Sequence, residues 1–243
     1  MIEVQQLYKR FGTVEAVKGV SFTARDGEVT GVLGPNGAGK TTSLRMITGL
    51  IKPDQGQVTV DGLDPVKQPI EVRRQLGVLP DARGLYRRLT ARENLEYFGA
   101  LQGLDAATIR RHADELIEQL GMETIAERHT EGFSNGQRVK VAIGRALIHH
   151  PQNVLLDEPT NGLDVMSIRA LRRFIADLAA QGRAVILSTH VMQEVAALCQ
   201  RIVIIGHGEV VADGSPDELI HMTQADSLED AFVALAGGEG LAA

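Results

Sequence analysis

The sequence GVLGPNGAGKTT, residues 31–42, sets four glycines and a lysine between an apolar run and a helix-like segment. Gly34, Gly39, Lys40 and Thr41 fit the spacing G-x-x-x-x-G-K-[ST]. Glycine tolerates positive φ angles, so backbone N–H groups can turn toward one anion, which the following helix also attracts with its positive N-terminal end. The stretch therefore predicts a phosphate-binding loop. The residues expected to hold the phosphates are Gly34, Pro35, Asn36, Gly37, Ala38, Gly39, Lys40, Thr41 and Thr42.

The context of this loop argues against a glycine-rich turn that merely contains a lysine. Residues 29–33 read as a buried strand and residues 41–50 read as a helix, which is the setting that the motif requires. In that setting Lys40 is expected to reach the β- and γ-phosphates, and the Thr41 hydroxyl is expected to ligate Mg²⁺. Many nucleotide-dependent enzymes carry such a loop, so the reaction has to be inferred from other residues.

Composition narrows the class of protein. The chain has 243 residues, of which 44% are hydrophobic, enough for one large or two modest domains. The net charge of −6 argues against a broad nucleic-acid interface, which needs a basic face, and the scattered arginine pairs read as solvated surface. The single cysteine, Cys199, excludes an internal disulfide and sits in an apolar setting that favours a buried position. The N-terminus lacks the apolar centre of a signal peptide, and no run of 18 apolar residues occurs, so any membrane role is expected through a partner.

Two kinds of apolar pattern predict the fold. Alternation typical of half-buried antiparallel strands occurs at 2–11, 18–24 and 57–63. Short continuous apolar runs, typical of parallel strands covered on both faces, occur at 31–35, 76–80, 153–159, 184–190 and 201–208. Helices are expected at 40–50, 136–149, 167–181 and 191–198. Strands alternating with helices indicate a wound α/β sheet, and the mainly helical region between about 82 and 150 reads as an insert in it. The small, glycine-rich end at 236–243 is expected to fray.

A pair of acids supplies a second chemical signal. Asp157 and Glu158 end the apolar run in NVLLDEP, and ligands of open α/β sheets bind at such strand ends. Two adjacent acids at the end of a buried strand are costly unless a cation compensates them. Asp157 is therefore expected on the Mg²⁺ side, and Glu158 is expected to polarise an attacking water. A solvent-exposed acid pair at a turn is the plainer alternative.

Two further features, one helix start and one histidine, allow both a structural and a chemical interpretation. Ser134 and Gln137 have capping-box spacing, which predicts a well-capped helix, and the same helix end could face a phosphate. The two interpretations are compatible. His190 ends the run AVILSTH at the edge that also carries Asp157. A histidine there is either structural or holds a γ-phosphate or the attacking water.

These elements, in this order, resemble the ATP-binding subunit of ATP-binding cassette (ABC) transporters over nearly the whole chain. GPNGAGKTT looks like the Walker A motif of that family, VLLDEP like Walker B, FSNGQ like the signature motif, NGLD like the D-loop and STH like the switch-histidine loop. Walker A alone is widespread, whereas the signature motif followed by Walker B and the D-loop is highly specific. The resemblance implies an ATPase that binds ATP and Mg²⁺ and works as a head-to-tail homodimer with integral membrane permease subunits.

The resemblance also implies roles for single residues. Phe11 stands where an aromatic side chain stacks on adenine, with Tyr8 as the alternative. Ser134, Gly136 and Gln137 would approach the nucleotide held by the other protomer. The remaining carried-over residues are Asp164 at the dimer seam, Glu158 and His190 as catalytic residues, and Thr41, Asp81 and Asp157 at the metal.

Two positions depart from the family pattern. The signature motif usually has glycine where this chain has Asn135, a mild change because asparagine tolerates left-handed backbone. After LGVLP the family usually has a glutamine that senses Mg²⁺ and the membrane partner, and here the residue is Asp81. An ionised aspartate can face Mg²⁺ but cannot donate a hydrogen bond to water, so coupling is expected to be tuned differently.

The expected architecture is a P-loop NTPase with a mostly parallel sheet, an antiparallel β subdomain and an inserted helical subdomain. We expect one domain over 1–243, with the α/β core at about 1–81 and 151–220, the helical part at about 82–150 and a tail at about 221–243. The region 80–99 and the tail resemble type-two exporters related to sodium- and drug-extrusion systems. That resemblance implies a peripheral protein at the cytoplasmic face of the inner membrane. A soluble ABC-class ATPase, an ATP-holding regulatory module and a small-molecule kinase are the rival hypotheses, and no nucleic-acid partner is expected.

Overall fold

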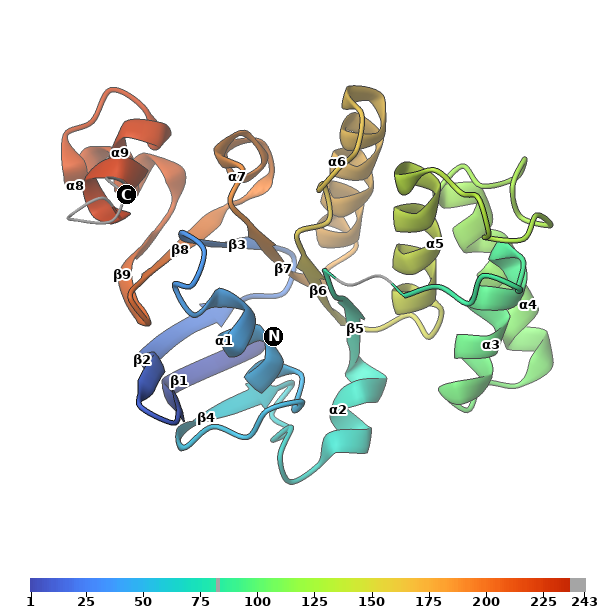
Figure 1. Ribbon diagram of the computed structural model, residues 1–243, viewed down its shortest axis with the longest axis horizontal. Helices are drawn as coiled ribbons and strands as arrows, with labels where there is room; N and C mark the ends of the chain where they lie inside the picture. The colour runs from blue at the N-terminus through green and yellow to red at the C-terminus, as the bar shows by residue number, and fades with distance from the viewer. Residues whose placement is uncertain (82–83, 237–243) are drawn as a thin grey trace.

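The computed structural model describes residues 1–81 and 84–236. Positions 237–243, where the sequence predicts fraying, lie outside the described residues. Figure 1 shows two sheets with helices around them and a group of helices set to one side.

A six-stranded sheet forms the centre of the fold. In spatial order its strands are β5 (Leu76–Leu79), β6 (Asn153–Asp157), β7 (Ala184–Thr189), β3 (Val29–Leu33), β8 (Arg201–Gly206) and β9 (Glu209–Gly214). The first five run parallel, as their continuous apolar runs predict, and β3, β6 and β7 are buried at every position. The antiparallel edge strand β9 was not predicted. It follows a tight turn in which His207 and Gly208 both have positive φ, the backbone of a two-residue hairpin turn.

A second, three-stranded antiparallel sheet has the order β2-β1-β4. Its strands are β1 (Ile2–Phe11), β2 (Val14–Ala24) and β4 (Gln55–Val60), which confirms the three alternating segments. One face of this sheet shares a core with α1 (Lys40–Ile47) and with one face of the central sheet. Side chains of the other face of the central sheet pack with helices, so the sheet is covered on both sides.

The inserted helices lie between β5 and β6 in the chain. They are α3 (Ala91–Leu101), α4 (Ala106–Gln119) and α5 (Asn135–Leu147). In Figure 1 they stand apart from the sheets, with α6 (Val165–Ala180) on the side toward the core. The other helices are α2 (Pro69–Gln75), α7 (Met192–Leu198), α8 (Pro216–Thr223) and α9 (Leu228–Ala236). The predicted helices at 40–50, 136–149, 167–181 and 191–198 are all present with slightly different ends, whereas α2, α8 and α9 were not predicted.

The phosphate-loop region is braced by the hairpin turn between β8 and β9. The Gly208 N–H donates to the Ala38 carbonyl at 3.0 Å, and the Lys18 N–H of β2 donates to the Gly208 carbonyl at 2.7 Å. Segments from the start and the end of the chain therefore meet at this loop. Within the described residues, no helix combines the length and apolar character needed to cross a membrane.

Candidate functional site

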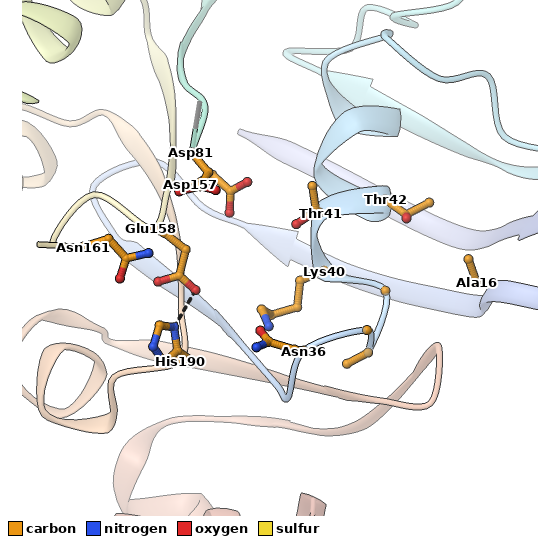
Figure 2. Close-up of a pocket in the computed structure, with 13 residues that line it drawn as sticks. Ala16, Asn36, Lys40, Thr41, Thr42, Asp81, Asp157, Glu158, Asn161 and His190 are labelled. Atoms are coloured by element: carbon orange, nitrogen blue, oxygen red, sulfur yellow. Dashed lines mark hydrogen bonds and ion pairs between the residues drawn. The ribbon is translucent and has the colours of Figure 1, made fainter. Parts of the chain in front are cut away.

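Neighbouring parallel strands end at one edge of the central sheet, and the predicted functional groups follow them. The glycine-rich loop follows β3, the two acids lie at the end of β6, and His190 follows β7. Together they enclose a cavity of about 350 Å³, shown in Figure 2. The cavity is lined by Ala16, Asn36, Gly37, Ala38, Gly39, Lys40, Thr41, Thr42, Asp81, Asp157, Glu158, Asn161 and His190.

The loop between β3 and α1 depends on glycine at particular positions. Gly37 and Gly39 have φ angles of 79° and 104°, a region that side chains disfavour. A Cβ on Gly39 would lie 2.6 Å from the Ala16 carbonyl oxygen, and one on Gly34 would overlap the Ile205 carbonyl. The loop thus curves tightly between β2 and β8 and leads directly into the N-terminus of α1.

Lys40, the first residue of α1, is buried against this loop. Its Nζ donates to the carbonyl of Gly34 at 2.6 Å and to that of Pro35 at 3.1 Å. Burial lowers the pKa of the ammonium group, and the charges of Glu158 and Asp157 oppose that shift. A cationic side chain is thereby held inside the cavity, opposite two acids.

The acid pair combines a buried carboxylate with an unusual backbone conformation. Asp157 ends β6 and is buried; burial raises its pKa, reinforced by the charges of Glu158 and Asp81. Glu158 adopts a left-handed backbone with φ of 49°, which is unusual for a side chain of this kind. The Nδ1 of His190 lies 2.8 Å from Glu158 Oε1, and because a carboxylate only accepts, Nδ1 is the donor (Figure 2).

Several predicted residues lie outside the cavity of a single chain. Ser134 caps α5 with both bonds of a capping box, as its spacing with Gln137 predicts. Asp164 caps α6 by accepting from the Ser167 N–H at 2.9 Å. Phe11, at the end of β1, is 48% exposed. The residues of the list that do not line the cavity are Phe11, Gly34, Pro35, Ser134, Gly136, Gln137 and Asp164.

Two residues that line the cavity were not predicted from the sequence. Asn161 is the first residue of NGLD, three positions after Glu158, so its place in the motif was a usable signal. Ala16 lies near the start of β2, and only the packing of β2 against the loop brings it to the cavity.

Comparisons with known proteins agree with this geometry. The family model described as ABC transporter matches residues 17–161, more than half of the chain. The ABC transporter ATP-binding protein NatA of Bacillus subtilis is 46% identical, over 96% of this chain and 97% of that protein. The linearmycin resistance ATP-binding protein LnrL of the same organism is 37% identical, over 94% of this chain and 73% of its own length.

Solved structures give the same result. A structure of the ATP-binding subunit of an ABC transporter superposes with a TM-score of 0.89 at 30% identity, covering 97% of this chain and 99% of that one. The cassette MJ0796, in a dimeric post-hydrolysis state with ADP and Pi, superposes with a TM-score of 0.79 at 28% identity, over 88% and 98% of the two chains. The described fold is therefore that of a P-loop NTPase of the cassette type. The fold agrees with the family match and with the nearly full-length likeness to NatA. The chain therefore belongs to the ABC transporter family, as an ATP-binding and ATP-hydrolysing subunit.

Proposed function

We propose that this chain powers an exporter by binding ATP between two copies arranged head to tail, at the cytoplasmic face of a membrane that holds its permease subunits. One observation carries the proposal: Lys40, Asp157, Glu158 and His190 converge on one cavity, whereas Ser134 lies outside it. Several relatives support the exporter reading by their names, among them the Nod factor export ATP-binding protein I of Ralstonia nicotianae and the lipopolysaccharide export protein LptB of Haemophilus influenzae.

The triphosphate fits the loop between β3 and α1. The positive end of α1 and the backbone of residues 34–39 favour an anion there, and Lys40 would exchange its two carbonyl partners for phosphate oxygens. Phe11 is exposed at the end of β1 and offers a face for adenine, with Tyr8, 37% exposed, as the alternative. Stacking of this kind contributes roughly 1–3 kcal/mol.

The donor set beside the loop suits Mg²⁺. Thr41, Asp81 and Asp157 line the cavity and offer one hydroxyl and two carboxylates, the oxygen ligands that this ion prefers. Burial, reinforced by the charges of Glu158 and Asp81, raises the pKa of Asp157, and a dication beside the carboxylate would stabilise its ionised form. When bound, Mg²⁺ would neutralise charge on the phosphates. A coupling role of Asp81 toward the membrane partner stays a prediction.

Glu158 would act on the attacking water. Its carboxylate would orient the attacking water and accept its proton, while His190, bonded to Oε1, fixes the carboxylate in position. The left-handed backbone of Glu158 directs the side chain into the cavity beside Lys40 and Asn161 (Figure 2). The hydrolysis step is thus assigned to residues of one protomer.

A second copy of the chain would supply the groups that contact the γ-phosphate. Ser134, Gly136 and Gln137 open α5 outside this chain's own cavity, so they would complete the cavity of a partner. Asp164, at the start of α6, would lie at the same seam. A shared ATP would then close the dimer, and hydrolysis would reopen it.

The proposal is tested by replacing Glu158 with glutamine and measuring steady-state phosphate release. We expect Glu158→Gln to lower turnover by at least about 100-fold because the water loses its base. Binding of a fluorescent ATP analogue should persist. Glu71→Gln, on the exposed face of α2, is the matched control and should keep wild-type turnover. Near wild-type turnover of Glu158→Gln would remove Glu158 from this role.

A further inference from the structure

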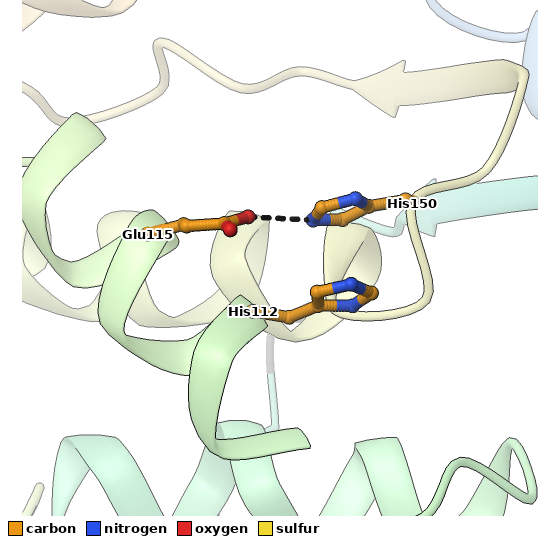
Figure 3. Close-up of side chains that lie close together, drawn as sticks. All are labelled: His112, Glu115 and His150. Carbon is orange, nitrogen blue, oxygen red and sulfur yellow. Dashed lines mark ion pairs between the residues drawn. The ribbon is translucent and has the colours of Figure 1, made fainter. Parts of the chain in front are cut away.

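One side-chain cluster away from the cavity has metal-ligating residue types but a geometry that does not suit a metal ion. His112, Glu115 and His150 join α4 to the connection between α5 and β6, as Figure 3 shows. The two imidazole rings stack 3.6 Å apart and nearly parallel, so their lone pairs do not converge on one point. His112 Nδ1 lies 2.8 Å from the Ile148 carbonyl and its Nε2 lies 3.3 Å from Arg111 Nη2. The cluster therefore connects α4 to the segment between α5 and β6 and does not form a metal site.

Asn135 makes a different link, at the position where the family usually has glycine. It is the first residue of α5, and its side chain reaches the turn that follows Glu158. Its Nδ2 donates to the carbonyl of Asn161 at 2.8 Å and to that of Gly162 at 3.0 Å. The start of the signature helix and the D-loop turn are thereby joined within one chain.

Only an amide group suits this link. One NH₂ group has two hydrogens, and each meets one carbonyl, whereas an aspartate carboxylate would repel both oxygens and a serine hydroxyl is too short. Gly162 completes the fit. Its φ of 71° is left-handed, and a Cβ there would lie 2.5 Å from Asn135 Nδ2. The two residues are matched to each other in size as well as in polarity.

The linked turn begins at Glu158, the proposed base. The Asn161 N–H donates to the Glu158 carbonyl at 3.3 Å, and the Leu163 N–H donates to the Thr160 carbonyl at 3.1 Å. Beside it, Gly136 packs closely on α6, since a Cβ at Gly136 would lie 3.2 Å from Ser167 Oγ. A displacement of the start of α5 would therefore pull on the turn behind Glu158.

We propose that Asn135 is a positioning residue that locks the start of the signature helix to the D-loop turn, so that both meet a partner protomer as one rigid unit. The inference rests on the proposed function, because the unit matters only if these two elements form the dimer seam. The lock itself belongs to the single chain and is measurable without ATP.

The first test is hydrogen–deuterium exchange of the nucleotide-free protein. In Asn135→Ser, which removes the amide group, we expect the amides of residues 160–163 to exchange at least about fivefold faster, because two hydrogen bonds no longer hold the turn. Asn135→Asp keeps the size of the side chain but has no NH₂ group, so it should speed exchange of the same amides, whereas the amides at the start of α8 should keep their wild-type exchange in both variants. Wild-type exchange at residues 160–163 in either variant would overturn the lock.

The second test measures its consequence in a Glu158→Gln background, by light scattering in MgATP. The added Asn135→Ser change should raise the protein concentration at half-dimerisation by at least about threefold, because a loose seam must be ordered on closure. Affinity of the monomer for a fluorescent ATP analogue should be unchanged. An unshifted midpoint overturns the inference alone. A Glu158→Gln parent that never dimerises overturns the proposed function and this inference with it, whatever the exchange experiment gives.

Discussion

Glu158 shows how one residue can be both strained and anchored. A left-handed backbone costs a side chain about 1–3 kcal/mol, so surrounding contacts have to hold it. Here the Glu158 N–H donates to the Ser188 carbonyl of β7 at 2.9 Å, and His190, just beyond the same strand, binds the carboxylate. Strand β7 thus fixes both the backbone and the side chain of the proposed base.

His149, two residues beyond the end of α5, allows a prediction at this scale. Burial lowers its pKa from 6.5 to about 4, so the folded protein holds this ring neutral while the unfolded chain protonates it below pH 6.5. Stability is therefore lost as the pH falls from 6.5 to about 4, by roughly 2–3 kcal/mol from this group. His149→Met should remove that part of the loss. Urea unfolding at pH 7.0 and 4.5 measures it, and equal pH dependence in both proteins would contradict the assignment.

Sequence alone could place the residues that stand at strand ends. Asp157, Glu158 and His190 were predicted together because the carboxyl ends of parallel strands share an edge. Ala16 and the hydrogen bonds of Asn135 could not be predicted, since they depend on how β2 and the D-loop turn pack, and no local pattern reports such packing. The strain at Glu158 likewise comes from its tertiary surroundings.

At the scale of elements, capping boxes fix where helices begin. Both reciprocal bonds are present at Ser134 of α5 and at Ser215 of α8, with Gln137 and Glu218 as their respective partners. The Ser134 box was predictable from spacing, and its outcome confirms the structural interpretation of that motif. Strand β9 was missed because its half-exposed pattern gives a weak signal and its turn depends on a histidine in an uncommon conformation.

The two boxes allow a matched prediction. Ser134→Ala and Ser215→Ala should each cost about 1 kcal/mol of stability, because each loses one cap hydrogen bond. Only Ser134→Ala should also lower ATP turnover, by at least about tenfold, since the proposed site uses that hydroxyl toward a phosphate. Urea unfolding and phosphate release on the same preparations give both values. Wild-type turnover in Ser134→Ala would leave Ser134 with its structural role alone.

At the scale of the whole molecule, a single chain presents half of each proposed site. Lys40 lines the cavity of its own chain, whereas Ser134 caps α5 outside that cavity. In a head-to-tail dimer, each cavity would combine Lys40 of one copy with Ser134 of the other. Mixing two inactive variants can restore a site that is shared between two chains, but it cannot restore a site that one chain forms alone.

Mixing Lys40→Ala protein with Ser134→Ala protein should restore activity that neither has alone. Mixed dimers have one site with both defects and one intact site, so an equal mixture should reach about a quarter of wild-type turnover. Lys40→Ala mixed with Glu158→Gln is the control and should stay inactive, because these two residues serve the same cavity. Phosphate release measures both mixtures. Absence of recovery in the first mixture would refute the head-to-tail arrangement.

The neighbours of β3 have a consequence for how the protein is made. This strand is encoded near the beginning of the chain, yet it pairs with β7 and β8, and the loop after it is braced by Gly208. During synthesis it must therefore wait, unpaired, until most of the polypeptide has left the ribosome. Nucleotide capture is then a late event of biogenesis, and truncated products that end before β8 would be released without a formed phosphate loop.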